Sequence, residues 1–216
     1  MDPLAAPALS RRALLLAPLL LGARAAGAAE DRAKAAEALI ERLAREAVAI
    51  VARRDLDLEG KLSRLERLLE EATDLDLIAR LIMGRYWRLA SPEQRRRFIA
   101  LFRALLRRSM ARRLERYSGE TLEVTGSVPL NGGGRDIIVR SRVRRPGGRP
   151  PYAVDWVVRQ RDGRFLIIDV IVEGVSMLVE QRAEVAAIAG RRGIDGLLAE
   201  LERRLEEPEG APRARG

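Results

Sequence analysis

Apolar residues recur at helical spacing through the first third of the chain. From residue 31 they follow each other at three- and four-residue steps, which is the spacing of a helix that buries one side. The pattern stops near residues 54–57 and then resumes, so two helices are predicted, each needing a surface to lie on. Their predicted buried positions are Leu39, Ile40, Leu43, Ala47 and Ile50, then Leu58, Leu62, Leu65, Leu69 and Ala72.

A third, shorter helix is predicted next. Thr73 or Asp74 can accept a hydrogen bond from its first free amides, and Gly84 marks its end. Its buried stripe is Leu75, Ile78 and Ile82.

A long helix is expected from Ser91 to about residue 117, before Gly119. Ser91 can cap it, Pro92 suits the first helical position, and Gln94 can complete a capping box. At 1.5 Å per residue it would span about 39 Å, so we expect it to lie along a whole sheet. Its apolar side carries Phe98, Leu101, Phe102, Leu105, Leu106 and Met110.

The pattern then changes to the two-residue period of strands. Residues 121–128 and 136–143 alternate, and the second run has Ile137, Val139 and Val143 on one face. Residues 131–134 form the turn between these runs, and residues 146–151 form the next turn. Two further apolar runs, 152–158 and 165–172, flank Asp162-Gly163, which is a strong hairpin signal.

Two registers are open for this hairpin, and they differ in which residues share a face. A two-residue loop would set Asp169 opposite Trp156. A loop one residue longer would set Val154, Trp156 and Val158 beside Leu166, Ile168 and Val170, with Asp155 opposite Asp169 on the other face. We favour the longer loop because it keeps one face wholly apolar.

The chain is predicted to end in helices. Ser176 can cap a helix over residues 177–189, Gly190 and Gly193 break it, and residues 194–205 form a second helix with Leu197, Leu198 and Leu201 inward. Residues 208–216 are expected to be disordered. The predicted fold is α+β: N-terminal helices and one long helix packed on a curved four-stranded antiparallel sheet, followed by C-terminal helices.

Composition removes several kinds of chemistry. The 216 residues include no Cys and no His, which excludes disulfides, the usual zinc sites, thiol nucleophiles and histidine bases. We therefore expect no metal, no cofactor and no catalytic residue. The formal net charge of +9 comes almost entirely from Arg, and it indicates either an anionic partner or merely many solvated charges.

The first 29 residues have the features of an export signal. Arg11 and Arg12 precede the apolar run 13–21, which is too short to span a bilayer, and small residues follow as far as Ala29. Cleavage after Ala28 or Ala29 would leave a domain of residues 30–207. The twin arginines leave the Tat and Sec routes both open. Export predicts a periplasmic protein, where a nucleic-acid partner is absent.

An enzyme would have to work with carboxylates. Asp155, Asp169 and Glu173 lie on predicted strands, and one of them inside an apolar cavity would have a raised pKa, as in carboxylate-dependent isomerases and dehydratases. The favoured register puts both aspartates on the other face. A third class, a basic protein that binds anionic polymers, would lose its affinity in salt.

Several sequence motifs resemble the MlaC family of periplasmic phospholipid-binding proteins. The resemblance covers about residues 75–201. It rests on Gly84-Arg-Tyr-Trp87, Ser91-Pro-Glu-Gln94 with Phe98 and Phe102, Gly148-Arg-Pro-Pro151, the Asp155 strand, Asp169-Val-Ile-Val-Glu-Gly-Val-Ser-Met177 and Gly193-Ile-Asp-Gly-Leu197.

This resemblance implies a lipid shuttle without enzymatic activity. Such carriers move phospholipid between an outer-membrane lipoprotein complex and an inner-membrane ABC transporter with a substrate-binding ring, and so preserve outer-membrane lipid asymmetry. A paralogue that carries hopanoid or another lipid is an alternative. The lipid, the direction of transport and the docking surface are left open.

A lipid carrier needs an apolar cavity between sheet and helices, because about 30 methylene groups cost more than about 20 kcal/mol in water. From the residues alone, a filled core explains the same side chains. The residues expected to line the cavity are Phe98, Phe102, Leu105, Met110, Val139, Val154, Trp156, Ile168, Val170, Val172 and Met177.

Overall fold

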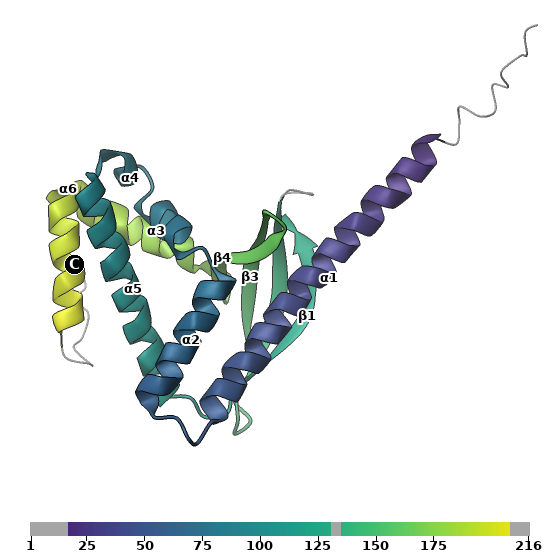
Figure 1. The fold of residues 1–216 in the computed structure, drawn as a ribbon, viewed down its shortest axis with the longest axis horizontal. Coiled ribbons are helices and arrows are strands. Elements are labelled where there is room, and N and C mark those ends of the chain that lie inside the picture. Colours follow the sequence, from purple (N-terminus) through teal and green to yellow (C-terminus); the bar gives the residue numbers. More distant parts are fainter. Residues whose placement is uncertain (1–16, 131–134, 208–216) are drawn as a thin grey trace, which may run out of the picture.

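The computed structural model describes residues 17–130 and 135–207 (Figure 1). The predicted turn at 131–134, the predicted tail at 208–216 and residues 1–16 of the predicted signal lie outside this range. The predicted cleavage position falls within the first helix and stays a prediction. Within the described residues, no helix is both long enough and apolar enough to cross a membrane.

The N-terminal helices form where the sequence predicts them. α1 (Ala17–Ala52) and α2 (Leu58–Ala72) are separated by residues 53–57, and α3 (Leu75–Met83) follows. Asp57 accepts a hydrogen bond from Gly60 N at 2.8 Å, and Asp74 accepts one from Leu77 N at 2.9 Å, so each caps its helix. Leu58 is 44% exposed. The prediction for Leu58 was wrong because it stands in the first turn of α2, beside the exposed 53–57 connection.

The long helix is α5 (Pro92–Glu115), preceded by the one-turn helix α4 (Tyr86–Leu89). Its predicted capping box is confirmed: Ser91 and Gln94 exchange backbone-to-side-chain hydrogen bonds of 2.9 and 3.1 Å. The expectation that α5 lies along the sheet was wrong. It packs instead against α6, α3 and α2, because its most buried residues, Phe98 and Leu101, meet the apolar side of α6.

The sheet is an antiparallel meander of five strands in the order β1-β2-β3-β4-β5. Their bounds are β1 Thr121–Pro129, β2 Asp136–Arg144, β3 Tyr152–Arg161, β4 Arg164–Val172 and β5 Val175–Ser176. The sequence predicted four strands. β5 was missed because two residues cannot show alternation; it turns back on β4 through Glu173 and Gly174, both at positive φ (49° and 82°).

The β3–β4 hairpin follows the predicted two-residue register near its turn. Asp162 and Gly163 have φ of 50° and 75°, and Arg161 pairs with Arg164, so the loop has two residues and the favoured longer loop was wrong. The extra residue is accommodated in the strand as a bulge at Ile168.

Beyond this bulge the pairing is shifted by one further residue and matches neither predicted register, although Trp156 and Val170 share a face as the favoured register predicted. Trp156 pairs with Val170, and Val154 pairs with Val172. Asp169 lies opposite Val157, and Asp155 lies opposite Ile171. The expected Asp155–Asp169 pair is therefore wrong.

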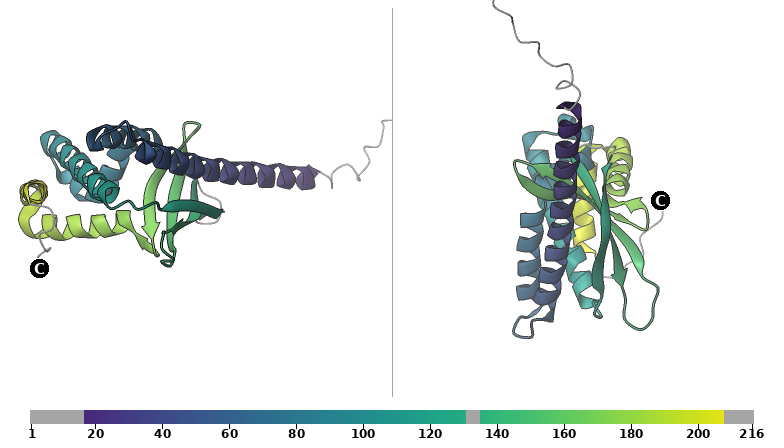
Figure 2. Two further views of the ribbon diagram at one scale, coloured as in Figure 1. Left: turned by 90° about the horizontal axis from the view of Figure 1, so that it is seen from below. Right: turned by 90° about the vertical axis from the view of Figure 1, so that its right-hand side faces the viewer.

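The last helix, α6 (Met177–Glu206), bends once. Gly193 has φ 70° and ψ −179°, a conformation that essentially only glycine adopts. Gly190, the other predicted break, keeps helical geometry. Figure 2 shows the sharp bend of α6, and Figure 1 shows its second half beside α5.

Two apolar clusters hold the fold together. The sheet cluster joins α1 to one face of β2, β3 and β4 and has the buried residues Ala36, Ile40, Ala72, Ile137, Val139, Val158 and Ile167. The helix cluster joins α3, α4, α5 and α6 and includes Met83, Phe98, Leu101, Leu197 and Leu198. Figure 1 shows the sheet under α1 on one side and the remaining helices on the other, with α2 between them.

Candidate functional site

The face of the sheet that α1 covers is apolar along its length. Strand alternation places Val139, Val154 and Trp156 on this face, and the β3–β4 pairing adds Val170 and Val172. Val139 is fully buried, and Val154 is 6% exposed. Trp156 and Val170 are half-buried against the sheet cluster. Five of the residues predicted to bind lipid are therefore brought together.

A fully buried polar side chain, Ser141, lies within this face, and its hydrogen bonds are made. Ser141, 2% exposed, donates from Oγ to the carbonyl oxygen of Val154 at 2.5 Å. The same Oγ accepts a hydrogen bond from Trp156 Nε1 at 3.0 Å. Because both partners are satisfied, the face keeps its apolar character. Sequence reasoning missed Ser141, although its place among Ile137, Val139 and Val143 on β2 was a usable signal.

The predicted residues on α5 belong to the helix cluster. Phe98 is 1% exposed, and Phe102 and Leu105 pack against the same cluster. Met110 lies apart from them. It lines a pocket of about 80 Å³ between α2 and α5, together with Leu69, Leu75 and Leu106.

Ion pairs close this pocket along the line where α2 and α5 meet, here called the α2–α5 seam. Arg103 binds Glu70 at 2.7 Å and Asp76 at 3.1 Å. One turn further along α5, Arg107 binds both Glu59 and Glu66. The four-residue spacing of Arg103 and Arg107 places both side chains on one side of α5, which is a sequence signal for this seam.

The large apolar cavity expected between the sheet and α5 is not confirmed. The α2–α5 pocket is far smaller than ligand pockets of about 300–1,000 Å³. An open groove of about 390 Å³ lies elsewhere, over Leu39 and Phe165 and between Arg42 and Arg164. The predicted lining residues divide between the two clusters because α5 packs on helices rather than on the sheet.

The junction between β4 and α6 is built around Asp169. Its carboxylate accepts hydrogen bonds from Val170 N at 2.8 Å, Leu178 N at 2.9 Å and Ser176 Oγ at 2.5 Å. Ser176 also caps α6 by accepting from Val179 N at 3.0 Å. Asp169 therefore fastens the start of α6 to the sheet.

The remaining predicted residues lie close to this junction. Ile168, at the bulge, is 5% exposed, and Met177 is the half-buried first residue of α6. Asp155 lies on the sheet face opposite to that of Val154 and Trp156, across from Arg140. Both aspartates are thus on the other face, as predicted.

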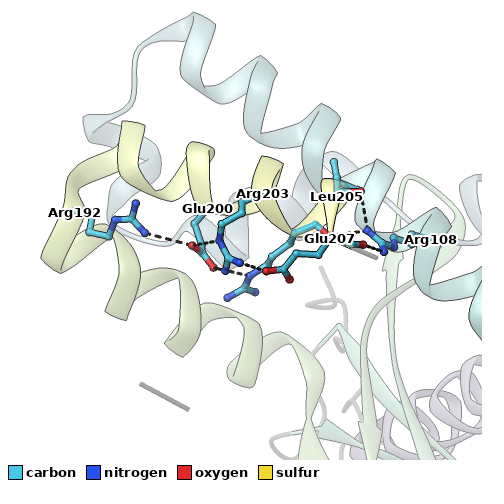
Figure 3. A network of polar contacts seen from close by, with 7 residues as sticks. Arg108, Arg192, Glu200, Arg203, Leu205 and Glu207 are labelled. Carbon is cyan, nitrogen blue, oxygen red and sulfur yellow. Dashed lines mark hydrogen bonds and ion pairs between the residues drawn. The ribbon is translucent and has the colours of Figure 1, made fainter. Parts of the chain in front are cut away.

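A polar network holds the returning half of α6 against α5 (Figure 3). Arg108 of α5 donates to the carbonyl oxygens of Arg204 and Leu205 at 2.7 and 2.8 Å and to that of Glu207. These are carbonyls that the end of a helix leaves unpaired, so Arg108 caps α6.

Glu200 is the centre of the second part of this network. Its side chain is 12% exposed and contacts Arg192 at 3.3 Å, Arg203 at 2.6 Å and Arg204 at 3.1 Å. The pKa of Glu200 is lowered from 4.5 to about 2, chiefly because Arg203 donates a hydrogen bond to the carboxylate. Burial opposes this shift, and Arg204 adds to it. The network stabilises the ionised carboxylate.

These features define an α+β protein with an antiparallel meander whose apolar face lies under one helix, beside a separate helix cluster. Within residues 17–130 and 135–207, no group of three acidic residues has the geometry to hold a metal ion. The family model described as MlaC protein matches residues 39–203. The chain belongs to the MlaC family.

A curated relative and a solved structure agree with this assignment. The intermembrane phospholipid transport system binding protein MlaC of Haemophilus influenzae is 25% identical over 137 residues, which are 62% of this chain and 64% of that protein. The chain thus aligns with slightly less than two thirds of that relative.

The solved structure is of a phospholipid-binding protein from Ralstonia solanacearum in complex with a phospholipid. It is similar with a TM-score of 0.68 and 25% identity, over 79% of this chain and 97% of that one.

Proposed function

We propose that this protein is a periplasmic carrier that binds phospholipid and moves it between an outer-membrane lipoprotein complex and an inner-membrane ABC transporter. The observation that carries the proposal is the structural similarity to a phospholipid-bound protein, which extends over 97% of that protein. The partners follow from the family and from the name of the Haemophilus relative. The periplasmic location rests on the predicted signal.

The energetics of a two-chain lipid dictate where it must sit. Sheltering about 30 methylene groups from water is worth more than about 20 kcal/mol, and a shallow groove cannot supply that. The apolar face of the sheet and the apolar side of α5 are the two surfaces long enough to do so. In the proposed lipid-bound state they face each other across the acyl chains.

The division of the core supports an opening between these surfaces. The sheet cluster, which includes α1, and the helix cluster, which includes α5, are separate, so a displacement of one relative to the other leaves each cluster intact. Trp156 and Val170 at the sheet cluster and Met110 in the α2–α5 pocket are only half-buried. Acyl chains would replace water at side chains that the closed structure leaves partly exposed.

A binding protein also fits the carboxylates better than an enzyme does. A catalytic aspartate would have to point into the apolar region. Asp169 instead accepts hydrogen bonds from three groups of the β4–α6 junction, and Asp155 lies on the outer face. We therefore assign catalysis to neither residue.

Native mass spectrometry with lipid extraction tests the proposal. The protein is purified from the membrane-free fraction of its host, and we expect about one phospholipid per chain. Met110→Glu and Trp156→Glu place a charge among the proposed acyl chains and should empty the protein. Leu58→Glu, at a residue that is 44% exposed, is the matched control. A folded protein that carries no lipid and cannot be loaded from vesicles would contradict the proposal.

A further inference from the structure

The short helix α4 holds a leucine out in solvent. Leu89 is 72% exposed, more than the other exposed large apolar residues of the described chain, Val48, Leu58, Val175 and Val179. It is the last residue of α4, just before the cap of α5. An apolar side chain so far from the core contributes little to folding.

The turn that carries Leu89 is anchored by contacts of Tyr86 and Trp87. Tyr86 is 8% exposed, and its hydroxyl donates to the carbonyl oxygen of Ala186 on α6 at 3.4 Å. Arg95 lies 5.4 Å from the ring centroid of Trp87 and donates to the Trp87 carbonyl oxygen at 2.8 Å. Leu89 is thus presented by an anchored turn.

Four arginines of α4, its N-cap and the neighbouring part of α6 have no carboxylate partner among the described residues. Arg85 is the N-cap residue of α4 and Arg88 lies within it, and Arg182 and Arg191 belong to the part of α6 before its bend. A Cβ at Gly84 would lie 3.0 Å from Arg182 Nε, and one at Gly190 would lie 3.1 Å from the Tyr86 hydroxyl, so the part of α6 before its bend lies against α4 and the residues just before it. All four guanidinium groups are exposed. None forms an ion pair with a carboxylate of residues 17–130 or 135–207.

Other charges at this end of the molecule leave the excess positive. Arg192 is paired with Glu200, and Glu93 is paired with Arg96. Asp195 accepts a hydrogen bond from Gln94. Figure 1 shows α4 and the bend of α6 at the same end of the helix cluster. We call this surface, made of Leu89 and the four arginines, the α4 tip.

We propose that the α4 tip docks on the surface of an anionic lipid bilayer, with Leu89 entering the interface and the arginines binding lipid phosphates. This inference rests on the proposed carrier function, which brings the protein to membranes. Guanidinium groups match phosphate oxygens in pairs, and a basic surface with one inserted apolar side chain binds membranes weakly and reversibly.

The form of the surface favours a bilayer over an acidic protein. Stable protein interfaces bury about 800 Å² on each partner around a packed apolar centre. The α4 tip offers a single projecting leucine instead. A fluid headgroup layer can close around such a projection, whereas a protein partner would need a matching pocket.

Flotation of the full mature chain with vesicles tests this docking. Vesicles of phosphatidylcholine with three parts in ten of phosphatidylglycerol are compared with pure phosphatidylcholine at 0.1 M NaCl. Arg88→Gln with Arg191→Gln should lower the partition constant on anionic vesicles about 25-fold, from the gain expected for each arginine near an anionic surface. Leu89→Ser should lower it about 5-fold.

Matched controls distinguish the effect of the α4 tip on the partition constant from the effect of overall charge. Arg140→Gln with Arg142→Gln removes the same charge from exposed positions on the outer face of β2, and Leu58→Ser removes another exposed leucine. Both should change the constant less than 2-fold. Equal losses in the two arginine variants, or no preference of the wild-type chain for anionic vesicles, would overturn the proposal. The proposal would also be overturned if the wild-type chain bound an acidic protein and did not bind anionic vesicles.

The same samples distinguish docking from cargo binding. Native mass spectra of Arg88→Gln with Arg191→Gln should retain the phospholipid of the wild-type chain, because the α4 tip lies outside the proposed acyl path. An empty wild-type protein that still floats with anionic vesicles would contradict the carrier function and leave the docking intact.

Discussion

Trp156 Nε1 donates a hydrogen bond to Ser141 Oγ, 3.0 Å away, within the apolar face of the sheet. Ser141 Oγ in turn donates a hydrogen bond to the Val154 carbonyl oxygen. Replacing Ser141 by Ala would leave the indole N–H without this partner, so we expect a loss of about 1–2 kcal/mol in the free energy of unfolding. Urea denaturation monitored by circular dichroism measures it.

The double variant provides the control for this pair. In Trp156→Phe with Ser141→Ala both polar partners are gone, and the further loss on adding Ser141→Ala to Trp156→Phe should be smaller than the loss caused by Ser141→Ala alone. Additive losses would show that the hydrogen bond contributes nothing to stability.

Asp169 should matter for stability far more than Asp155. Asp169→Ala removes the acceptor for two amides and a hydroxyl at the β4–α6 junction, and we expect it to cost about 2–3 kcal/mol. The side chain of Asp155 forms no hydrogen bond or ion pair with residues 17–130 or 135–207. Asp155→Ala should therefore cost less than about 0.5 kcal/mol. Thermal melts of the two variants test the ranking, which the reverse order would refute.

The α2–α5 seam should control how fast lipid exchanges. Arg103→Gln with Arg107→Gln removes the ion pairs to Glu59, Glu66, Glu70 and Asp76. Exposed pairs contribute only about 0.2–1 kcal/mol each, so the fold should survive while the seam opens more often. We expect faster transfer of a fluorescent phospholipid between protein and vesicles. Salt should accelerate wild-type transfer and leave the variant unchanged.

An ion pair on the other side of α5 supplies the control for the seam. Arg97 makes a two-bond contact with Glu202 of α6, with both bonds at 2.7 Å. Arg97→Gln should therefore leave the transfer rate unchanged. If it accelerates transfer as much as the seam variant does, loosening of α5 in general explains the effect.

Glu200 should make stability depend on pH. Its folded-state pKa is about 2, below its ordinary 4.5, owing first to the hydrogen bond from Arg203. The carboxylate therefore contributes stability that is present above about pH 4.5 and is lost as the pH falls toward 2. Because its arginine partners are half exposed, we discount the shift to about 1–2 kcal/mol.

Denaturation at several pH values measures this contribution. Glu200→Gln should be less stable than the wild-type chain at pH 7, and the gap should narrow as the pH falls below 4.5. Asp55→Asn is the comparison, because Asp55 also has its pKa lowered to about 2 by Arg53 but is 61% exposed. A gap for Glu200→Gln that is the same at pH 7 and pH 3 would contradict the assignment.

The local structure of this protein was readable from its sequence. Asp57, Asp74, Ser91 and Ser176 cap the helices by contacts within a few residues, and Asp162-Gly163 closes the hairpin. Such signals involve neighbours in the chain, so no long-range information is needed to interpret them. The family was recognisable for a similar reason, since its motifs are short continuous stretches.

The partners of each apolar surface depended on the tertiary structure. The stripe of α5 is compatible with a sheet or with helices, and only packing decided for α6, α3 and α2. The bulge at Ile168 reconciles a two-residue turn with a strand face that stays apolar. The ion pairs of Arg103 with Glu70 and Asp76 join residues that are far apart in the chain. Periodicity states which side of an element is buried, but a hydrophobic surface is non-directional and does not specify what covers it.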